Sequence, residues 1–219
     1  MERLRMGFHA IGLHGILLCM IAFSIQVHAG VDEDLIRAVE NNNAYRAGNL
    51  LARGANPDAR DSRSYTALML AARHKKTKLV ELLLAADADV NLRNRYGETA
   101  IMLASYHGQV EMVKQLYKKN AHFEHAGWSP LIYAATNGHH EIVAFLLDSG
   151  AHINATTDNG TTALMMAVRG NHYDTVKLLL TRGANLQASN EAGETALNWA
   201  DKKERNNIVK LLRENGHID

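Results

Sequence analysis

Three short stretches of the sequence carry residue types that could do chemistry. Residues 127–130 (GWSP) superficially match the turn that exposes a nucleophilic serine, but proline stands where that turn needs a second glycine. His122 and His125 are close enough to share a zinc ion, yet no cysteine or clear acidic partner completes a tetrahedral set. The run at residues 73–78 (RHKKTK) is either a basic patch for an acidic partner or a solvated surface between helices.

Other signatures of catalysis are missing from the sequence. It has no phosphate-binding glycine loop and a single cysteine, Cys19. Lys and Arg total 24 and Asp and Glu total 23, so charge gives no reason to expect a nucleic acid or an anionic membrane as partner. We therefore expect no enzymatic activity, no catalytic residue, no metal, no cofactor and no small-molecule substrate.

The amino-terminal segment has the pattern of an export signal. Arg3 and Arg5 precede a largely apolar run over residues 11–25, which ends in VHA at residues 27–29. This order is typical of a secretory signal peptide cleaved after its last small residue, here at position 29. An uncleaved membrane anchor is the alternative, although two glycines and two histidines within residues 8–27 make a poor span. We expect the mature chain to be periplasmic or secreted and not to span a membrane.

The rest of the chain repeats with a period of 33 residues. GETAIMLASYHGQVEMVKQL (97–116), GWSPLIYAATNGHHEIVAFL (127–146) and GTTALMMAVRGNHYDTVKLL (160–179) are variants of one pattern. A threonine or serine opens each unit, with successive steps of 33, 30, 33 and 33 residues: Thr66, Thr99, Ser129, Thr162 and Thr195. A regular period of this length is typical of a repeat protein.

Each unit predicts a pair of helices. The opening hydroxyl is suited to an N-cap, where its oxygen accepts a hydrogen bond from a free helix N–H. The small pair at residues 134–135 then permits close approach of backbones, and Ile142, Val143 and Leu146 give the second helix an apolar stripe. Gly150 stands where a left-handed residue ends that helix.

This unit resembles the ankyrin repeat, whose first helix opens T-P-L-H-x-A. The matching segments here read SPLIYA, TALMLA, TAIMLA, TALMMA and TALNWA, with the proline kept only at Pro130 and the histidine in none. The resemblance covers about residues 31–219 and implies an all-α solenoid of about six helix pairs linked by β-hairpin-like fingers. The implied division is a signal peptide (1–29), a degenerate N-terminal capping repeat (30–60), four full repeats (61–189) and a C-terminal capping repeat (190–219).

The resemblance also assigns roles to residues between the helices. Lys75 and Asn171 replace an expected inter-helix glycine, and a positive φ would cost Lys75 about 1 kcal/mol or more. His139 and His172 occupy the position where such repeats usually carry a histidine, so we interpret both as structural.

Contacts with a partner are implied at the finger tips and on the first helices, which form the concave face. Tyr, Trp and Arg are enriched in interface hot spots, although Tyr65 and Tyr96 could instead merely pack along the fingers. The predicted protein-binding residues on or beside the fingers are Arg63, Tyr65, Arg95, Tyr96, Glu98, Trp128, Asp158, Asn159 and Glu191, and those on the adjoining helical ridge are Arg73, Tyr106, Thr136, Asn137 and Arg169.

The single 30-residue step shortens the finger between repeats three and four, beside Trp128. One interpretation is a tolerated loop deletion. The other is a notch floored by Trp128 and flanked by Tyr96, into which part of a partner inserts.

The sequence thus predicts an exported ankyrin-repeat scaffold that binds another protein through its concave face and finger tips. Protection of an envelope enzyme and neutralisation of a toxin by an immunity protein are the two roles we consider. A secreted effector that binds host proteins, or a membrane-anchored interaction module, is the alternative.

Overall fold

The computed structural model describes residues 30–124 and 127–216 of the 219-residue chain. The expected signal peptide with its cleavage site, and His125, therefore lie outside the described residues. Within the described part, no helix combines the length and the apolar character that crossing a bilayer requires.

The described chain is a series of helix–turn–helix pairs. A helical segment over residues 30–40 and α2 (Ala44–Ala52) form the first pair. The later pairs combine a first helix of seven residues with a second helix of nine or ten: α3 (Ala67–Arg73) with α4 (Thr77–Ala85), α5 (Ala100–Tyr106) with α6 (Val110–Lys118), α7 (Pro130–Thr136) with α8 (His140–Asp148), α9 (Ala163–Arg169) with α10 (Tyr173–Thr181), and α11 (Ala196–Lys202) with α12 (Asn206–Asn215).

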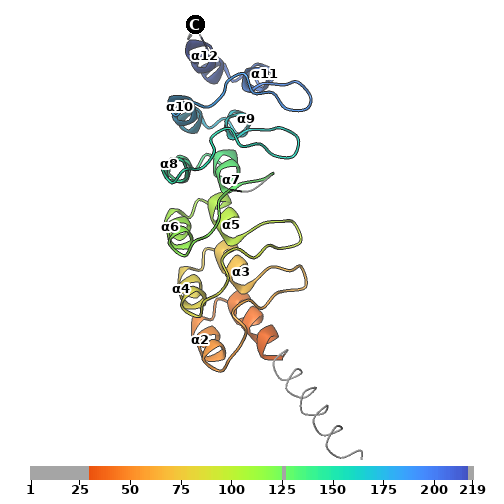
Figure 1. Ribbon diagram of the computed structural model, residues 1–219, viewed down its shortest axis with the longest axis vertical. Helices are drawn as coiled ribbons and strands as arrows, with labels where there is room; N and C mark the ends of the chain where they lie inside the picture. Colours follow the sequence, from red (N-terminus) through yellow and green to blue (C-terminus); the bar gives the residue numbers. More distant parts are fainter. Residues whose placement is uncertain (1–29, 125–126, 217–219) are drawn as a thin grey trace, which may run out of the picture.

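The pairs stack in two columns (Figure 1). The second helices α2, α4, α6, α8, α10 and α12 form one column, the first helices form the next, and the loops between pairs project from the first-helix side as fingers. In the described residues the fingers contain only isolated β-bridges, such as the one between Arg60 and Thr66. The expected all-α solenoid is confirmed. We call the surface formed by the first helices and the fingers the inner face.

Stacking, rather than helix length, stabilises these elements. A seven-residue helix is too short to persist alone in water. The first helices α3, α5, α7 and α9 are mostly buried: in α7, Leu131, Ile132, Ala134 and Ala135 are at most 2% exposed. In the terminal helix α11, only Ala196 and Ala200 are buried. In α8, Ile142 and Leu146 are completely buried, as the apolar stripe predicts. Each layer of the core is thus shared by successive repeats.

A threonine or serine is the N-cap residue of every first helix from α3 onward, and the predicted cap bond is confirmed for all of them except Thr99, whose hydroxyl has no hydrogen-bond partner among the described residues. Each cap residue has extended backbone geometry, and Pro130 follows its cap at a position where no backbone N–H is needed. Four cap hydroxyls accept a hydrogen bond from the N–H three residues further on: Thr66 from Met69 (3.2 Å), Ser129 from Ile132 (3.3 Å), Thr162 from Met165 (3.3 Å) and Thr195 from Asn198 (3.3 Å).

The turns inside the pairs require left-handed backbone, and Lys75 and Asn171 adopt it, with φ of 57° and 59°. The conformation expected from their position in the repeat is therefore present without glycine. Gly138 meets the same requirement and a steric one, because an added Cβ would lie 2.5 Å from Nδ1 of His172. A glycine here thus makes room for the histidine of the next repeat.

His139 and His172 connect neighbouring repeats. Nε2 of His139 lies 3.0 Å from the carbonyl oxygen of Tyr106, and Nε2 of His172 lies 3.0 Å from that of Thr136. Each ring thus bonds to a carbonyl at the end of the preceding first helix. The structural role predicted for both histidines is confirmed.

A second set of bonds links the bases of successive fingers. In each, a side-chain oxygen at a finger base accepts the backbone N–H of a residue in the next repeat, and we call these bonds rungs. The rungs join Asp58 to Asp89 (2.8 Å), Asn91 to His122 (2.7 Å), Glu124 to His152 (3.0 Å) and Asn154 to Asn185 (2.8 Å). The rung at Glu124 shows that the shortened finger keeps this connection.

Candidate protein-binding surface

The carboxylate of Glu98 joins three successive repeats on the inner face. Its Oε2 accepts hydrogen bonds from the hydroxyl of Tyr65 (3.2 Å) and from Nδ2 of Asn94 (2.7 Å), while Oε1 accepts one from the hydroxyl of Tyr133 (3.1 Å). The backbone N–H of Glu98 donates to Oδ1 of Asn94 (3.0 Å), so the finger itself positions the carboxylate. Tyr65 belongs to repeat two and Tyr133 to repeat four, and this single side chain therefore couples their positions.

Five aromatic side chains lie around this carboxylate, and we call them the aromatic cluster: Tyr65, Tyr96, Tyr106, Trp128 and Tyr133. The ring centroid of Tyr133 is 5.0 Å from that of Trp128 and 5.8 Å from that of Tyr106, and the centroids of Tyr65 and Tyr96 are 6.4 Å apart. Tyr96, Tyr106 and Trp128 are 64%, 41% and 40% exposed. They offer contact area, while Tyr65 and the half-buried Tyr133 support them.

Tyr65 differs from the expectation of a surface contact residue, because it is only 7% exposed. The guanidinium carbons of Arg63 and Arg73 each lie 5.5 Å from its ring centroid, and that of Arg95 lies 5.2 Å from the ring of Tyr96. Cation–π contacts at these distances hold a guanidinium beside a ring. The predicted arginines thus border the aromatic cluster with positive charge.

The electrostatics of the cluster follow from burial. Burial, and after it the charge of Glu98 and the hydrogen bond to it, raises the pKa of Tyr133 and of Tyr65 above the ordinary value of 10.0. Both hydroxyls are protonated donors to Glu98 at neutral pH. The pKa of His107, in the same region, is lowered from 6.5 by burial first and by the charge of Lys75 second. The neutral forms of these three groups are therefore favoured in the folded chain.

Three of the predicted contact residues make hydrogen bonds within the scaffold. The hydroxyl of Thr136 donates to the carbonyl of Ile132 (2.7 Å), and Nδ2 of Asn137 donates to the carbonyl of Tyr106 (3.1 Å). Oδ1 of Asn159 accepts from two threonine hydroxyls of its own finger (2.6 and 2.8 Å). These polar groups are therefore engaged within the chain and support the inner face.

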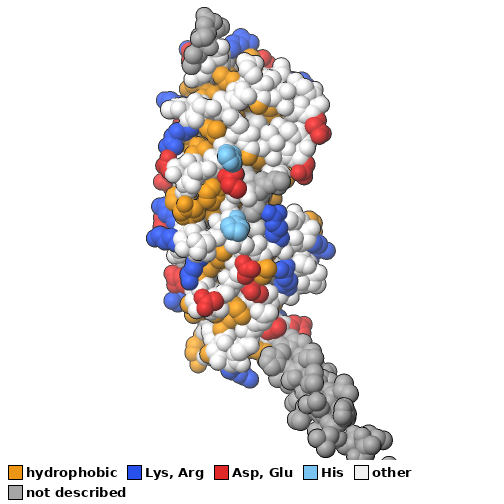
Figure 2. Space-filling view, in the orientation of Figure 1, with side chains coloured by type: hydrophobic (Ala, Val, Ile, Leu, Met, Phe, Trp, Pro, Cys, Tyr) orange, Lys and Arg blue, Asp and Glu red, His pale blue; other side chains and the backbone are white. Residues whose placement is uncertain are grey.

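Positively and negatively charged residues lie on different fingers of the stack. Asp158 and Glu191, both exposed, lie on the fingers of repeats five and six. Figure 2 shows Lys and Arg side chains over the fingers of the amino-terminal half and Asp and Glu side chains over those of the carboxy-terminal half. Exposed arginines on the fingers of repeats two and three are Arg60, Arg63, Arg93 and Arg95. The aromatic cluster lies on the arginine side of this division, and Arg169 lies apart from it at the end of α9.

The expected notch is described on one side only, since residues 125–126 lie outside the described residues. Trp128 contacts Tyr133, whereas the ring contact of Tyr96 is with Tyr65. On the other side, a Cβ at Gly127 would lie 2.8 Å from Oδ1 of Asp158, so the next finger approaches closely there. Trp128 is therefore exposed between the ring of Tyr133 and the finger that carries Asp158.

Sequence reasoning missed Tyr133 and Asn94. Tyr133 lies four residues after its cap, where three other repeats place Leu70, Leu103 or Met166, and this position was therefore interpreted as core. A signal was available, because a hydroxyl at an apolar position needs a partner when it is buried. The contacts of Asn94 could not be predicted because they depend on how the finger turns back on itself, which brings Asn94 beside Glu98.

Two of the three stretches first considered for chemistry contain a residue with a structural role. Ser129 is 3% exposed and its hydroxyl caps α7, and the N–H of His122 forms a rung. Within residues 30–124 and 127–216, no three His, Cys, Asp or Glu side chains are grouped to hold a metal ion.

Stacked helix pairs with projecting fingers and an exposed aromatic cluster are typical of a helical-repeat interaction domain. The family model described as "Ankyrin repeats (3 copies)" matches residues 35–126, 68–157 and 131–219. This chain belongs to the ankyrin repeat family. The fold is typically a non-catalytic module that binds other proteins.

Individual proteins show how far the similarity extends. The crystal structure of the ankyrin repeat domain of Bcl-3, "a unique member of the IkappaB protein family", is similar with a TM-score of 0.73 and 29% identity, covering 84% of this chain and 86% of that one. The probable E3 ubiquitin-protein ligase XBOS32 of Oryza sativa subsp. japonica is 62% identical over 37 residues, and the E3 ubiquitin-protein ligase XBAT32 of Arabidopsis thaliana is 57% identical over 37 residues. These segments make up 17% of this chain and only 8% and 7% of the two ligases.

Proposed function

We propose that this chain is an exported scaffold whose inner face binds another protein through the aromatic cluster. The single observation that carries the proposal is the grouping of three exposed aromatic side chains on two supporting tyrosines: Tyr106 and Trp128 contact Tyr133, and Tyr96 contacts Tyr65. Glu98 accepts a hydrogen bond from the hydroxyl of each supporting tyrosine. Large aromatic groups that are exposed and preorganised lose little conformational freedom when a partner covers them.

The borders of the cluster favour an acidic partner surface at its amino-terminal end. Arg63, Arg73 and Arg95 lie against its rings, and Asp61, which is 3.4 Å from Nε of Arg63, is itself mostly covered. Complementary charge guides the approach and orientation of a partner. We therefore expect binding to weaken with rising salt.

Export is the second part of the proposal and rests on the amino-terminal sequence pattern. The two roles proposed in the envelope are protection of an enzyme and neutralisation of a toxin. We do not propose ligase activity for this chain, because its similarity to the plant ligases is limited to segments about as long as one repeat. Amino-terminal sequencing of the fractionated protein tests export: a mature chain that begins at Gly30 supports it, and recovery of residues 1–29 in the membrane fraction favours an anchor.

Binding is tested by affinity capture from envelope extracts with immobilised wild-type protein and a matched set of variants. Trp128→Ala and Tyr106→Ala should each weaken capture of the same protein, by about 2 kcal/mol or more for a hot-spot residue. Tyr173→Ala is the control, since Tyr173 has a similar exposure of 38% but begins the second helix α10. Thermal melts of every variant separate lost binding from lost folding. Normal capture by both cluster variants would contradict the proposed site.

A further inference from the structure

A second recess lies on the inner face at the carboxy-terminal end of the stack. Its walls come from α11, from the finger that precedes α11 and from the end of α9. The lining residues are Arg169, Glu194, Trp199, Lys202 and Lys203, and we call this site the Trp199 recess. Its volume of about 300 Å³ is at the lower end for ligand sites and suits one or two side chains.

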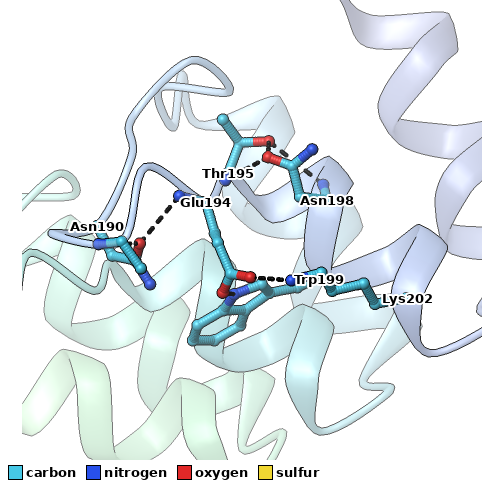
Figure 3. Close-up of polar contacts among 7 residues, drawn as sticks. Asn190, Glu194, Thr195, Asn198, Trp199 and Lys202 are labelled. Atoms are coloured by element: carbon cyan, nitrogen blue, oxygen red, sulfur yellow. Dashed lines mark hydrogen bonds and ion pairs between the residues drawn. The ribbon is translucent and has the colours of Figure 1, made fainter.

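Glu194 fixes the indole that forms the apolar wall of this recess (Figure 3). Oε2 of Glu194 accepts the indole N–H of Trp199 (2.6 Å), and Oε1 accepts a hydrogen bond from the ammonium of Lys202. The backbone N–H of Glu194 donates to Oδ1 of Asn190 (2.9 Å), so the finger turn positions the carboxylate. The hydrogen bond from Lys202, and then the one from Trp199, lowers the pKa of Glu194. The carboxylate of Glu194 is therefore ionised, and both of its oxygens already accept hydrogen bonds from within the chain.

The recess has more positive than negative charge. Arg169, Lys202 and Lys203 line it together with a single carboxylate, which Lys202 already contacts. Arg169 and Lys203 are exposed, and among the described residues neither has an ion pair within 4.0 Å. The nearby Asp201 pairs instead with Arg213, at 3.5 Å. Two cations beside a fixed aromatic wall thus lack a counter-charge.

We propose that the Trp199 recess binds an acidic side chain and its apolar neighbour from an internal segment of a partner protein. The indole supplies apolar contact area, and the guanidinium of Arg169 and the ammonium of Lys203 bind the carboxylate through charge-assisted hydrogen bonds. The inference deepens the proposed function, on which it rests for the protein nature of the ligand, by adding a second contact point to the aromatic cluster. The two points are separate, because Arg169 and Trp199 belong to repeats five and six.

The chain contains two tryptophans, and this permits a direct test without the natural partner. Protein labelled with ¹⁵N gives one indole N–H signal from Trp128 and one from Trp199, and Trp199→Phe assigns them. The probe is the acetylated and amidated peptide Gly-Leu-Glu-Leu-Gly, whose blocked ends carry no charge. We expect a saturable shift of the Trp199 signal while the Trp128 signal stays in place.

Two comparisons isolate the carboxylate. The matched peptide Gly-Leu-Gln-Leu-Gly should bind roughly tenfold more weakly, because it lacks the charge that strengthens the hydrogen bonds. The double variant Arg169→Gln, Lys203→Gln should lose a similar factor for the Glu peptide, whereas Lys210→Gln, on the exposed side of α12, should not. Both substituted residues are exposed, so the double variant should keep the wild-type melt.

Three results would overturn the inference. No shift of the Trp199 signal at saturating peptide would show that the recess is not a binding site for this class. Equal binding of the Glu and Gln peptides would show that charge has no part in it. Binding only of a peptide with a free carboxy terminus would assign the recess to chain ends rather than internal segments. Loss of partner capture in the Trp128→Ala variant bears on the proposed function alone, because this titration does not involve that residue.

Discussion

Removal of the hydroxyl of Tyr133 should show how much Glu98 contributes to the organisation of the inner face. The substitution Tyr133→Phe keeps the ring that contacts Trp128 and Tyr106 and deletes only the donor to Oε1 of Glu98. A hydrogen bond to a charged group contributes about 1.5–3 kcal/mol. Because Tyr133 is only half-buried and water can partly replace the bond, we expect a loss of about 1–2 kcal/mol in the free energy of unfolding.

A double-mutant cycle separates this bond from other effects of the substitution. Tyr133→Phe should cost less in a Glu98→Ala background than in the wild type, with a coupling of about 1 kcal/mol. Urea unfolding followed by far-ultraviolet circular dichroism measures the free energy of unfolding of the wild type, both single variants and the double variant. An unchanged m-value shows that the substitutions leave the unfolded state unaltered. Tyr173→Phe is the control, and it should change stability by less than about 0.5 kcal/mol. Equal costs of Tyr133→Phe in both backgrounds would refute the role assigned to Glu98.

Three further predictions concern the scaffold. Leu146→Ala should cost about 2–5 kcal/mol and loosen hydrogen exchange in the adjoining helices α6 and α10, whereas Leu147→Ala, at a partly exposed site, should cost less. Lys75→Gly should stabilise the chain by about 0.5–1 kcal/mol in urea unfolding, because relief of the left-handed strain exceeds the entropy cost of glycine. The raised pKa values of Tyr65 and Tyr133 should make the free energy of unfolding fall as the pH rises above 10. The reason is that these tyrosines ionise in the unfolded chain at a lower pH than in the folded chain. A free energy of unfolding that stays constant between pH 9 and 11 would contradict the raised pKa values.

The fold was predictable because each local sequence signal of secondary structure occurs in several repeats. Threonine at the caps, alanine pairs in the first helices and the left-handed positions at Lys75 and Asn171 all agree with one architecture. The loss of glycine at Lys75, Asn171 and Glu204 does not change the left-handed backbone at these positions, which Gly108 and Gly138 share in the other repeats. Secondary structure and core positions therefore follow from the period alone.

The contact networks were less predictable because they depend on departures from the period. Tyr133 and Trp199 occupy equivalent positions four residues after their caps, where other repeats carry aliphatic side chains. Each bonds to a glutamate that precedes a cap, Glu98 or Glu194, but Tyr133 reaches the preceding repeat and Trp199 reaches its own finger. The sequence shows a glutamate before each of these caps and a polar aromatic residue after it, whereas which of them bond to each other is seen only in the three-dimensional structure.

The rungs have a consequence for how such a chain changes length. Eight positions separate rung from cap in three of the repeats, Asp58 to Thr66, Asn91 to Thr99 and Asn154 to Thr162, but only five separate Glu124 from Ser129. The three-residue loss thus lies between the rung and the cap, and the rung at Glu124 is kept. A polypeptide built in this way can vary its finger tips through insertion and deletion during evolution while the spacing of its layers stays constant.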